Sequence, residues 1–237
     1  MRVLSGIPEI DKLEHEIALP APELVGSVDQ LLPNIEAVQI SAKTRGLDKL
    51  SDHSALRRVV ARGIGDNELE YIGRITWLEQ LELAAPTSRD LGALQNLSGL
   101  RILSTSNGSR LESFAGIENL RRLQLLSSSN TPKLASIDVI GSLADLRILF
   151  LAGGMYKPIR IPSLRPLSSL DRLLKLVLSN VRVDEGSLGP LAGLKSLRRL
   201  SLPLYFAAEE FMMLERSLPN ALGDWRDLWR GQAEEKQ

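Results

Sequence analysis

The chain has 237 residues, no cysteine, and equal numbers of basic and acidic side chains, 29 of each. A chain of this length can bury a large core in one domain or in two. The absence of cysteine excludes a disulfide framework and thiolate chemistry, and the balanced charge gives no overall field that would select nucleic acid or an anionic membrane. No run of about 18 apolar residues occurs, so no membrane-spanning helix is expected.

The first twenty residues contain acids and prolines where a secretory signal needs an uninterrupted apolar stretch. Together with the lack of cysteine this favours a cytoplasmic location, and export by a signal that the sequence does not show stays open. The stretch EHEIAL, residues 14–19, fits a degenerate strand unit with Ile17 and Leu19 pointing inward. We therefore expect residues 1–34 to form an N-terminal cap that includes this degenerate unit.

From residue 35 onward the chain repeats a pattern of leucine, two variable residues, leucine, one variable residue and leucine. It reads LRILST at Leu100, LRRLQL at Leu120 and LRILFL at Leu146. The eight units have their first positions at Ile35, Leu56, Leu78, Leu100, Leu120, Leu146, Leu173 and Leu197. Self-similarity of this kind indicates a solenoid, in which each unit buries its apolar face against its neighbours.

These units resemble the leucine-rich-repeat family, whose pattern is L-x-x-L-x-L-x-x-N/C-x-L, and in particular its small members that consist of repeats alone. The resemblance implies an α/β repeat solenoid that is right-handed and curved, with a parallel β-sheet on the concave face. Short helical, 3₁₀ or loop segments would form the convex side. The expected organisation is a single domain over residues 1–237, with about eight repeats in residues 35–204. Asn107, Asn130 and Asn180 fall near the asparagine position of the pattern but not on it, so no continuous asparagine ladder is expected.

Side chains alternate between the two faces of a strand, so the fourth and sixth positions of each unit point inward together. Six leucines of the central units are therefore predicted to be fully buried: Leu123, Leu125, Leu149, Leu151, Leu176 and Leu178. Residues 205–237 are expected to close the end of the solenoid as a helical cap with a disordered tail, GQAEEKQ. Within this segment the apolar residues recur at helical spacing: Phe211, Leu214, Leu218, Trp225, Leu228 and Trp229.

No pattern of catalytic or metal-binding residues stands out in the sequence. The two histidines, His15 and His53, lie in different units and have no partner at metal-ligand spacing, and no phosphate-binding glycine loop occurs. We therefore expect no catalytic residue, no cofactor and no metal ion, and a protein that is not an enzyme.

The outward positions of the expected sheet are mostly polar, but apolar residues gather on three neighbouring strands. They are Leu126, Ile148, Phe150, Ala152 and Val177, with Tyr156 on the following loop and with Arg122, Gln124 and Lys175 at the rim. An exposed apolar patch with a polar rim is typical of a protein-binding site. The sequence therefore predicts a protein partner on the concave face, although the long loop of residues 152–172 could instead fold over the patch and bury it.

Arginine recurs at the second position of five units: Arg57, Arg101, Arg121, Arg147 and Arg198. Such a column could follow the backbone of a nucleic acid or another polyanion. No aromatic residues are interleaved to stack bases, so a nucleic acid is the alternative partner rather than the expected one. A third hypothesis, an exported effector with the same fold, changes the location but not the chemistry.

Overall fold

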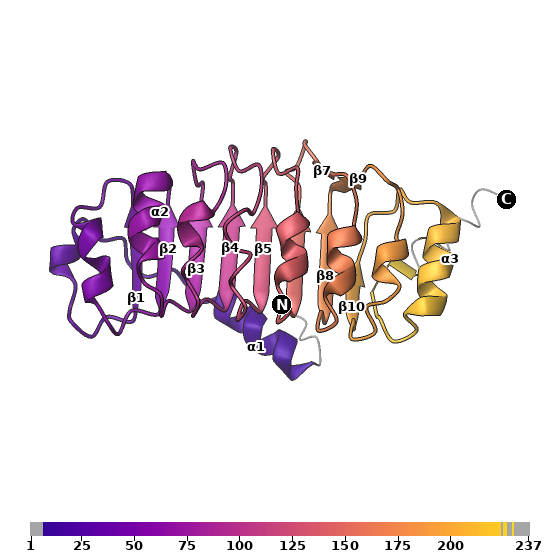
Figure 1. Ribbon diagram of the computed structural model, residues 1–237, viewed down its shortest axis with the longest axis horizontal. Coiled ribbons are helices and arrows are strands. Elements are labelled where there is room, and N and C mark those ends of the chain that lie inside the picture. Colours follow the sequence, from indigo (N-terminus) through magenta and orange to yellow (C-terminus); the bar gives the residue numbers. More distant parts are fainter. Residues whose placement is uncertain (1–6, 224, 227–228, 230–237) are drawn as a thin grey trace.

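The computed structural model describes residues 7–223, 225–226 and 229, and there the chain forms a curved solenoid on an eight-stranded parallel sheet (Figure 1). The strands are β1 Ala37–Ser41, β2 Arg58–Arg62, β3 Gln80–Ala84, β4 Ile102–Ser106, β5 Leu125–Ser129, β6 Ile148–Ala152, β8 Lys175–Ser179 and β10 Arg199–Ser201. They lie side by side in chain order, and each pairs in parallel with the strand of the next repeat. The predicted repeat solenoid is confirmed.

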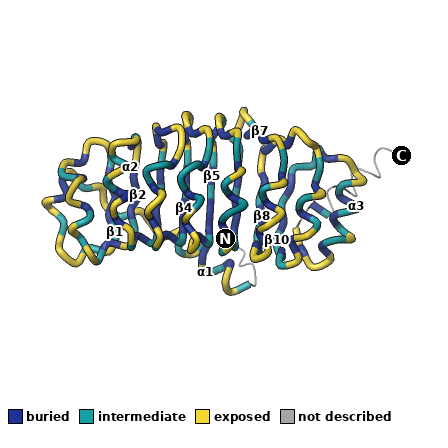
Figure 2. The backbone as a smooth tube through the Cα atoms, viewed as in Figure 1, coloured by how far each residue is buried: buried dark blue, intermediate teal, exposed yellow. Residues whose placement is uncertain are grey.

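Neighbouring strands pair without offset, so side chains at the same repeat position stack into columns. The column at the fourth position is at most 2% exposed throughout: Val38, Val59, Leu81, Leu103, Leu126, Leu149, Leu176 and Leu200. The six leucines predicted to be buried are also at most 2% exposed. Figure 2 shows the resulting alternation of buried and more exposed positions along the strands.

Short helices and turns return the chain along the convex side. They are the α-helix α2 Asp66–Gly73 and the 3₁₀ segments η2 Leu47–Asp52, η3 Gly92–Leu94, η4 Asp138–Ser142, η5 Arg165–Ser169 and η6 Gly189–Leu191. A Cβ on Gly73 would lie 2.0 Å from the carbonyl oxygen of Ala93, so α2 can approach the next return segment only because residue 73 has no side chain. Two returns also contribute the short strands β7 Ile159–Ile161 and β9 Val181–Val183, which pair in parallel.

The turns that leave five of the eight strands use a left-handed residue at the eighth position of the repeat. Five such residues have φ between 48° and 62°: Gly63, Ala85, Asn107, Asn130 and Asn180. Asparagine tolerates this conformation better than most residues. The three asparagines therefore share one structural position, one residue before the family's asparagine position, and Asn130 Nδ2 donates to Asn107 Oδ1 at 2.8 Å. One side-chain hydrogen bond thus links the asparagines of these two neighbouring repeats.

The first end of the solenoid is covered by residues 24–31, which include η1 Val28–Gln30 and form parallel bridges from Leu24 to Gln39 and from Ser27 to Arg45. The prediction of a degenerate strand unit at residues 14–19 is wrong. Most of this stretch belongs to the helix α1 Pro8–Ile17, and the Leu19 side chain is 41% exposed instead of pointing inward. The helical spacing of Ile10, Leu13 and Ile17 determines the structure here, and the strand-like alternation of Ile17 and Leu19 does not.

At the other end, the helix α3 Ala208–Ser217 contacts the last return segment, η6, and buries Phe211 and Leu214 in the main core. Trp225 is fully buried, and its ring lies 6.2 Å from that of Phe211. Leu228 and the tail of residues 231–237, for which the sequence made predictions, lie outside the described residues.

Candidate functional site

The outward side of the sheet, here called the concave face, carries one row of apolar side chains. Ile102, Leu125 and Ile148 are aligned by strand pairing on β4, β5 and β6, at the third position of their repeats. On the next outward row, Phe150 of β6 pairs with Val177 of β8. The term apolar row is used below for Ile102, Leu125 and Ile148.

The register of the fifth unit differs from the prediction by three residues. Leu126 aligns with Leu103 and Leu149 and is 0% exposed, so its expected place on the concave face is wrong. The unit begins at Leu123, 23 residues after Leu100 and 23 before Leu146, and its sixth position is Ser128 instead of a leucine. The alternative start at Leu120 satisfies the leucine pattern better but breaks the even spacing.

The same shift moves three polar residues. Arg122 and Gln124 were expected on the concave face, at the rim of the apolar patch, but both precede β5, which begins at Leu125. Gln124 therefore occupies the second position of its unit, where its carbonyl oxygen accepts hydrogen bonds from the backbone of Arg147 and Ile148. Arg121 drops out of the arginine column for the same reason.

The apolar row is covered by the chain's own N-terminal helix. Ile10 and Leu13 of α1 form a buried cluster with Ile102, Leu125 and Ile148, separate from the main core. All five side chains are at most 3% exposed. Leu125 is thus buried beneath α1 and not inside the solenoid. In Figure 1, α1 lies at the lower edge of the sheet, below β4 and β5.

Three carboxylates of α1 meet three cations at the start of the strands. Glu9 lies 3.3 Å from Arg147, Glu16 lies 3.5 Å from Arg101, and Glu14 pairs with Lys175. Ion pairs that stay partly exposed, as these do, contribute up to about 1 kcal/mol each, whereas burying one leucine-sized side chain contributes about 1.5–3 kcal/mol. The apolar contact therefore supplies most of the stability of the docked helix, and the ion pairs match its acidic side chains with basic ones. Arg101, Arg147 and Lys175 are called the basic rim below.

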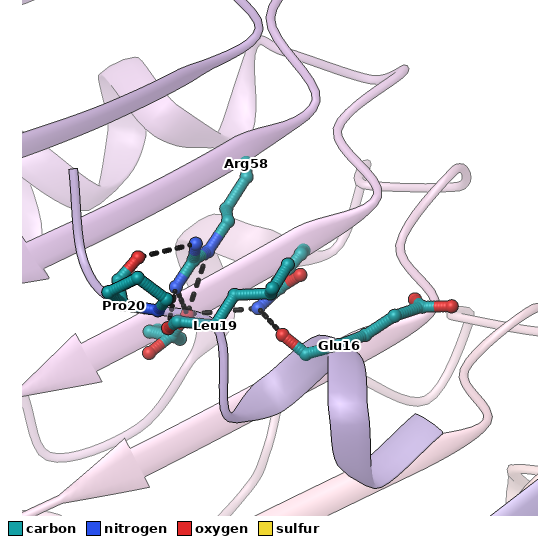
Figure 3. Close-up of polar contacts among 6 residues, drawn as sticks. Glu16, Leu19, Pro20 and Arg58 are labelled. Atoms are coloured by element: carbon teal, nitrogen blue, oxygen red, sulfur yellow. Dashed lines mark hydrogen bonds and ion pairs between the residues drawn. The ribbon is translucent and has the colours of Figure 1, made fainter. Parts of the chain in front are cut away.

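The chain that leaves α1 is also fixed to the concave face (Figure 3). Arg58 donates to the carbonyl oxygens of Leu19 at 2.9 Å and Pro20 at 3.0 Å, and its guanidinium also pairs with Glu82 at 2.8 Å. The side-chain amide of Gln80 donates to the carbonyl oxygen of Glu16 at 3.3 Å. The N-terminal segment therefore runs from β6 back toward β1 along the sheet.

An open groove of about 170 Å³ continues beside α1. Its lining, called the side groove here, consists of Glu14, Ile17, Leu125, Ser127, Ile148, Phe150, Lys175 and Val177. Phe150, Val177 and Lys175 are partly buried, so they retain accessible surface next to the docked helix. Of the residues predicted to bind a partner, the structure brings Ile148, Phe150, Val177 and Lys175 together here.

The loop after β6 does not bury the patch. Met155 and Tyr156 are 86% and 89% exposed, and Ala152, at the last position of β6, is partly buried. The covering element that the sequence analysis considered is therefore not this loop but α1. The signal for α1 is present in the sequence as Ile10, Leu13 and Ile17 at helical spacing, with Pro8 at the first helical position.

The arginine column is largely engaged within the protein. Arg57 lies 3.6 Å from Glu79, Arg101 lies 3.4 Å from the same carboxylate, and Arg147 pairs with Glu9 of α1. Arg198 donates to the carbonyl oxygen of Lys195. A second groove, of about 720 Å³, is lined by Arg57, Trp77, Glu79, Arg101 and Arg122 among others. It combines the cations with a carboxylate.

Within the described residues, no cluster of three histidine, aspartate or glutamate side chains is placed to hold a metal ion. Among the helices of the same residues, none is both long enough and apolar enough to cross a lipid bilayer.

No protein-family model and no curated protein matches the sequence. Solved structures do match its fold. Internalin C2 of Listeria monocytogenes has a TM-score of 0.51 and 23% identity, and the match covers 68% of this chain and 65% of internalin C2. A leucine-rich-repeat protein of Leptospira interrogans has a TM-score of 0.47 and 17% identity, with 83% and 63% covered.

A third match is the ectodomain of the Arabidopsis thaliana receptor kinase GASSHO1, solved in complex with Casparian Strip Integrity Factor 2. Its TM-score is 0.45 and its identity 18%, with 69% of this chain and 20% of the receptor chain covered. The matched part spans less than two thirds of each of the three proteins. At these identities the similarity concerns the fold. The chain therefore folds as a leucine-rich-repeat solenoid, as its repeats predicted.

Proposed function

We propose that the protein is a non-enzymatic binding module that holds a protein partner against its concave face. Solenoids of this kind present extended concave surfaces that are used for binding. A rigid sheet surface binds with little ordering cost, because its side chains are already fixed by the strands.

The observation that carries the proposal is the apolar surface in the middle of an otherwise polar concave face. The apolar row is already occupied by an amphipathic helix, so this face can accept a helical segment. Phe150 and Val177 extend the apolar surface beyond α1, and Lys175 adds a cation at its edge. Ala152 and the exposed Tyr156 complete the set of proposed contact residues.

The arginine column supports the alternative partner, a nucleic acid or another polyanion, less well. Arg57, Arg101 and Arg147 each lie within 3.6 Å of a carboxylate of the same chain. A polyanion would have to compete with these carboxylates. The cytoplasmic location stays a prediction, as does the alternative of an exported effector.

Site-specific photo-crosslinking in the full chain tests the proposal. A photoreactive phenylalanine analogue at Phe150 should capture a discrete protein in cells, and the same analogue at Ser201, on the concave side of β10, should not. Phe150→Ala should then weaken binding of the captured protein by at least about 2 kcal/mol. Equal capture at both positions, or cross-links to nucleic acid alone, would argue against the proposal.

A further inference from the structure

We propose that the partner of the concave face is an acidic amphipathic helix, which binds the apolar row and the basic rim in place of α1. This inference rests on the proposed function and names the class of partner. It makes α1 an intramolecular competitor for the binding site.

The spacing of the apolar row suits a helix that lies across the strands. Adjacent strands are about 4.8 Å apart, and residues i and i+3 of an α-helix are about 4.5 Å apart along its axis. A helix across β4, β5 and β6 can therefore place one apolar side chain at each strand. In α1, Ile10 and Leu13 pack against Ile102, Leu125 and Ile148, and Ile17 lines the side groove.

The basic rim gives the site its preference for acidic helices. Arg101, Arg147 and Lys175 come from three different repeats, and each faces a different carboxylate of α1. Counted from Ile10 as position i, the matching carboxylates lie at i−1, i+4 and i+6, and the apolar residues at i, i+3 and i+7. A neutral or basic helix would leave the three partly buried cations without these partners.

α1 itself is built to be exchanged. It has ten residues, and its N-cap residue Ile7 makes no side-chain capping bond. Isolated helices shorter than about 12–15 residues are marginal in water, so α1 depends on the site for its stability. Its buried cluster is separate from the core of the solenoid, so its release leaves that core closed.

Because α1 is tethered to the site by a short connection, it competes at an effective concentration in the millimolar range. A free helix is then weakened in the intact protein by the ratio of this effective concentration to the dissociation constant of α1 for the empty site, which is about tenfold for a dissociation constant of about 0.1 mM. This predicts that opening α1 increases the affinity for a free acidic helix.

The test uses the full chain with α1 opened by Ile10→Asp and Leu13→Asp. The matched control is Lys12→Asp with His15→Asp, which places the same new side chains on the exposed side of α1. The probes are a fluorescent peptide of residues 7–19 and a designed alanine–glutamine helix that keeps only the three carboxylates and three apolar residues of the pattern. Binding is measured by fluorescence anisotropy.

Both peptides should bind the opened variant at least tenfold more tightly than the control variant. Peptides with glutamine in place of the three glutamates should bind at least tenfold more weakly than their acidic counterparts. No binding of the acidic peptides to the opened variant, or equal binding of the glutamine peptides, would overturn the inference.

Hydrogen exchange on the unmodified protein guards against misfolding of the opened variant. Saturating acidic peptide should increase deuterium uptake in residues 8–17 and leave the strands unchanged, and unchanged uptake in residues 8–17 would contradict the inference. The outcome is separable from that of the proposed function. If cross-linking at Phe150 captures a protein but neither peptide binds, only the class of partner is wrong.

Discussion

The guanidinium of Arg101 lies 3.5 Å from the carboxylate of Glu16, although 85 positions separate the two residues. Arg101 stands directly before β4 and Glu16 near the end of α1, so the pair links the N-terminal helix to the fourth repeat. Both side chains are 23% exposed. Because the pair joins α1 to the sheet, it should stabilise the docked position of α1 and not the packing of one repeat on the next.

Glu16→Gln is expected to loosen α1 without destabilising the repeats. The local opening free energy of residues 8–17, measured by hydrogen exchange, should fall by up to about 1 kcal/mol. The melting temperature of the solenoid should stay nearly unchanged. Lys12→Gln, on the exposed side of α1, is the control, and an equal effect of both variants would show that the Arg101 pair has no role in docking.

The register of the fifth repeat can be tested with two adjacent residues. Leu126 is 0% exposed in the main core, whereas Ser127 faces the side groove. Leu126→Ala should lower the free energy of unfolding by about 2–5 kcal/mol, since it leaves a cavity. Ser127→Ala should change it by less than about 0.5 kcal/mol. Chemical denaturation measures both, and the reverse order would favour a unit that starts at Leu120.

The periodicity of leucine was sufficient to predict the solenoid, because inward positions of stacked strands have few alternatives to large aliphatic residues. It failed in the fifth unit, where two frames fit and the true one places Ser128 in the core. The equal spacing of Leu100, Leu123 and Leu146, and the alignment of Asn130 with Asn107, are the sequence signals that support the true frame.

The docking of α1 could not be read from the sequence in the same way. The helical spacing of Ile10 and Leu13 indicates an amphipathic helix, but the surface that this helix covers is assembled from residues up to 161 positions away. No local pattern specifies such a pairing. The same docking explains why Ile102, Leu125 and Ile148 are apolar on a face that otherwise favours polar side chains.

The buried hydroxyl of Ser128, in the core of the fifth repeat, has two hydrogen-bond partners. Thr105 Oγ1 donates to Ser128 Oγ at 2.9 Å, and Ser128 Oγ lies 2.9 Å from Thr131 Oγ1, with all three residues 0% exposed. Ser128→Ala should cost about 1–3 kcal/mol, because it leaves two buried hydroxyls without this partner.

The triple variant Thr105→Val, Ser128→Ala and Thr131→Val should be more stable than Ser128→Ala alone. Replacing all partners by apolar groups of similar shape removes the unsatisfied hydroxyls together. Urea denaturation of both variants gives the comparison. A triple variant whose loss equals the sum of the single losses would show that the three hydroxyls act independently.

Tyr205 provides a test of alkaline stability. Its hydroxyl oxygen accepts a hydrogen bond from the backbone N–H of Val183 at 2.7 Å, and its ring stacks on Phe206. Burial raises the pKa of the Tyr205 phenol above its ordinary value, and this effect exceeds the opposing effects of the Val183 N–H and the Arg182 charge. The folded state thus holds the phenolic proton more tightly than the unfolded state does.

The stabilising contribution of this proton is present below the unfolded pKa of about 10 and is lost as pH rises from there through the folded value. The unmodified protein should therefore lose stability relative to Tyr205→Phe above about pH 10. Tyr205→Phe should itself be less stable by about 1–3 kcal/mol below that pH, because the Val183 N–H loses its acceptor. Urea denaturation between about pH 8 and 11 measures the difference, which should shrink as Tyr205 ionises in the unfolded chain.

Tyr156→Phe, at a ring that is 89% exposed, should leave the free energy of unfolding unchanged over the same range. A difference between the protein and Tyr205→Phe that stays constant across this range would contradict the raised pKa.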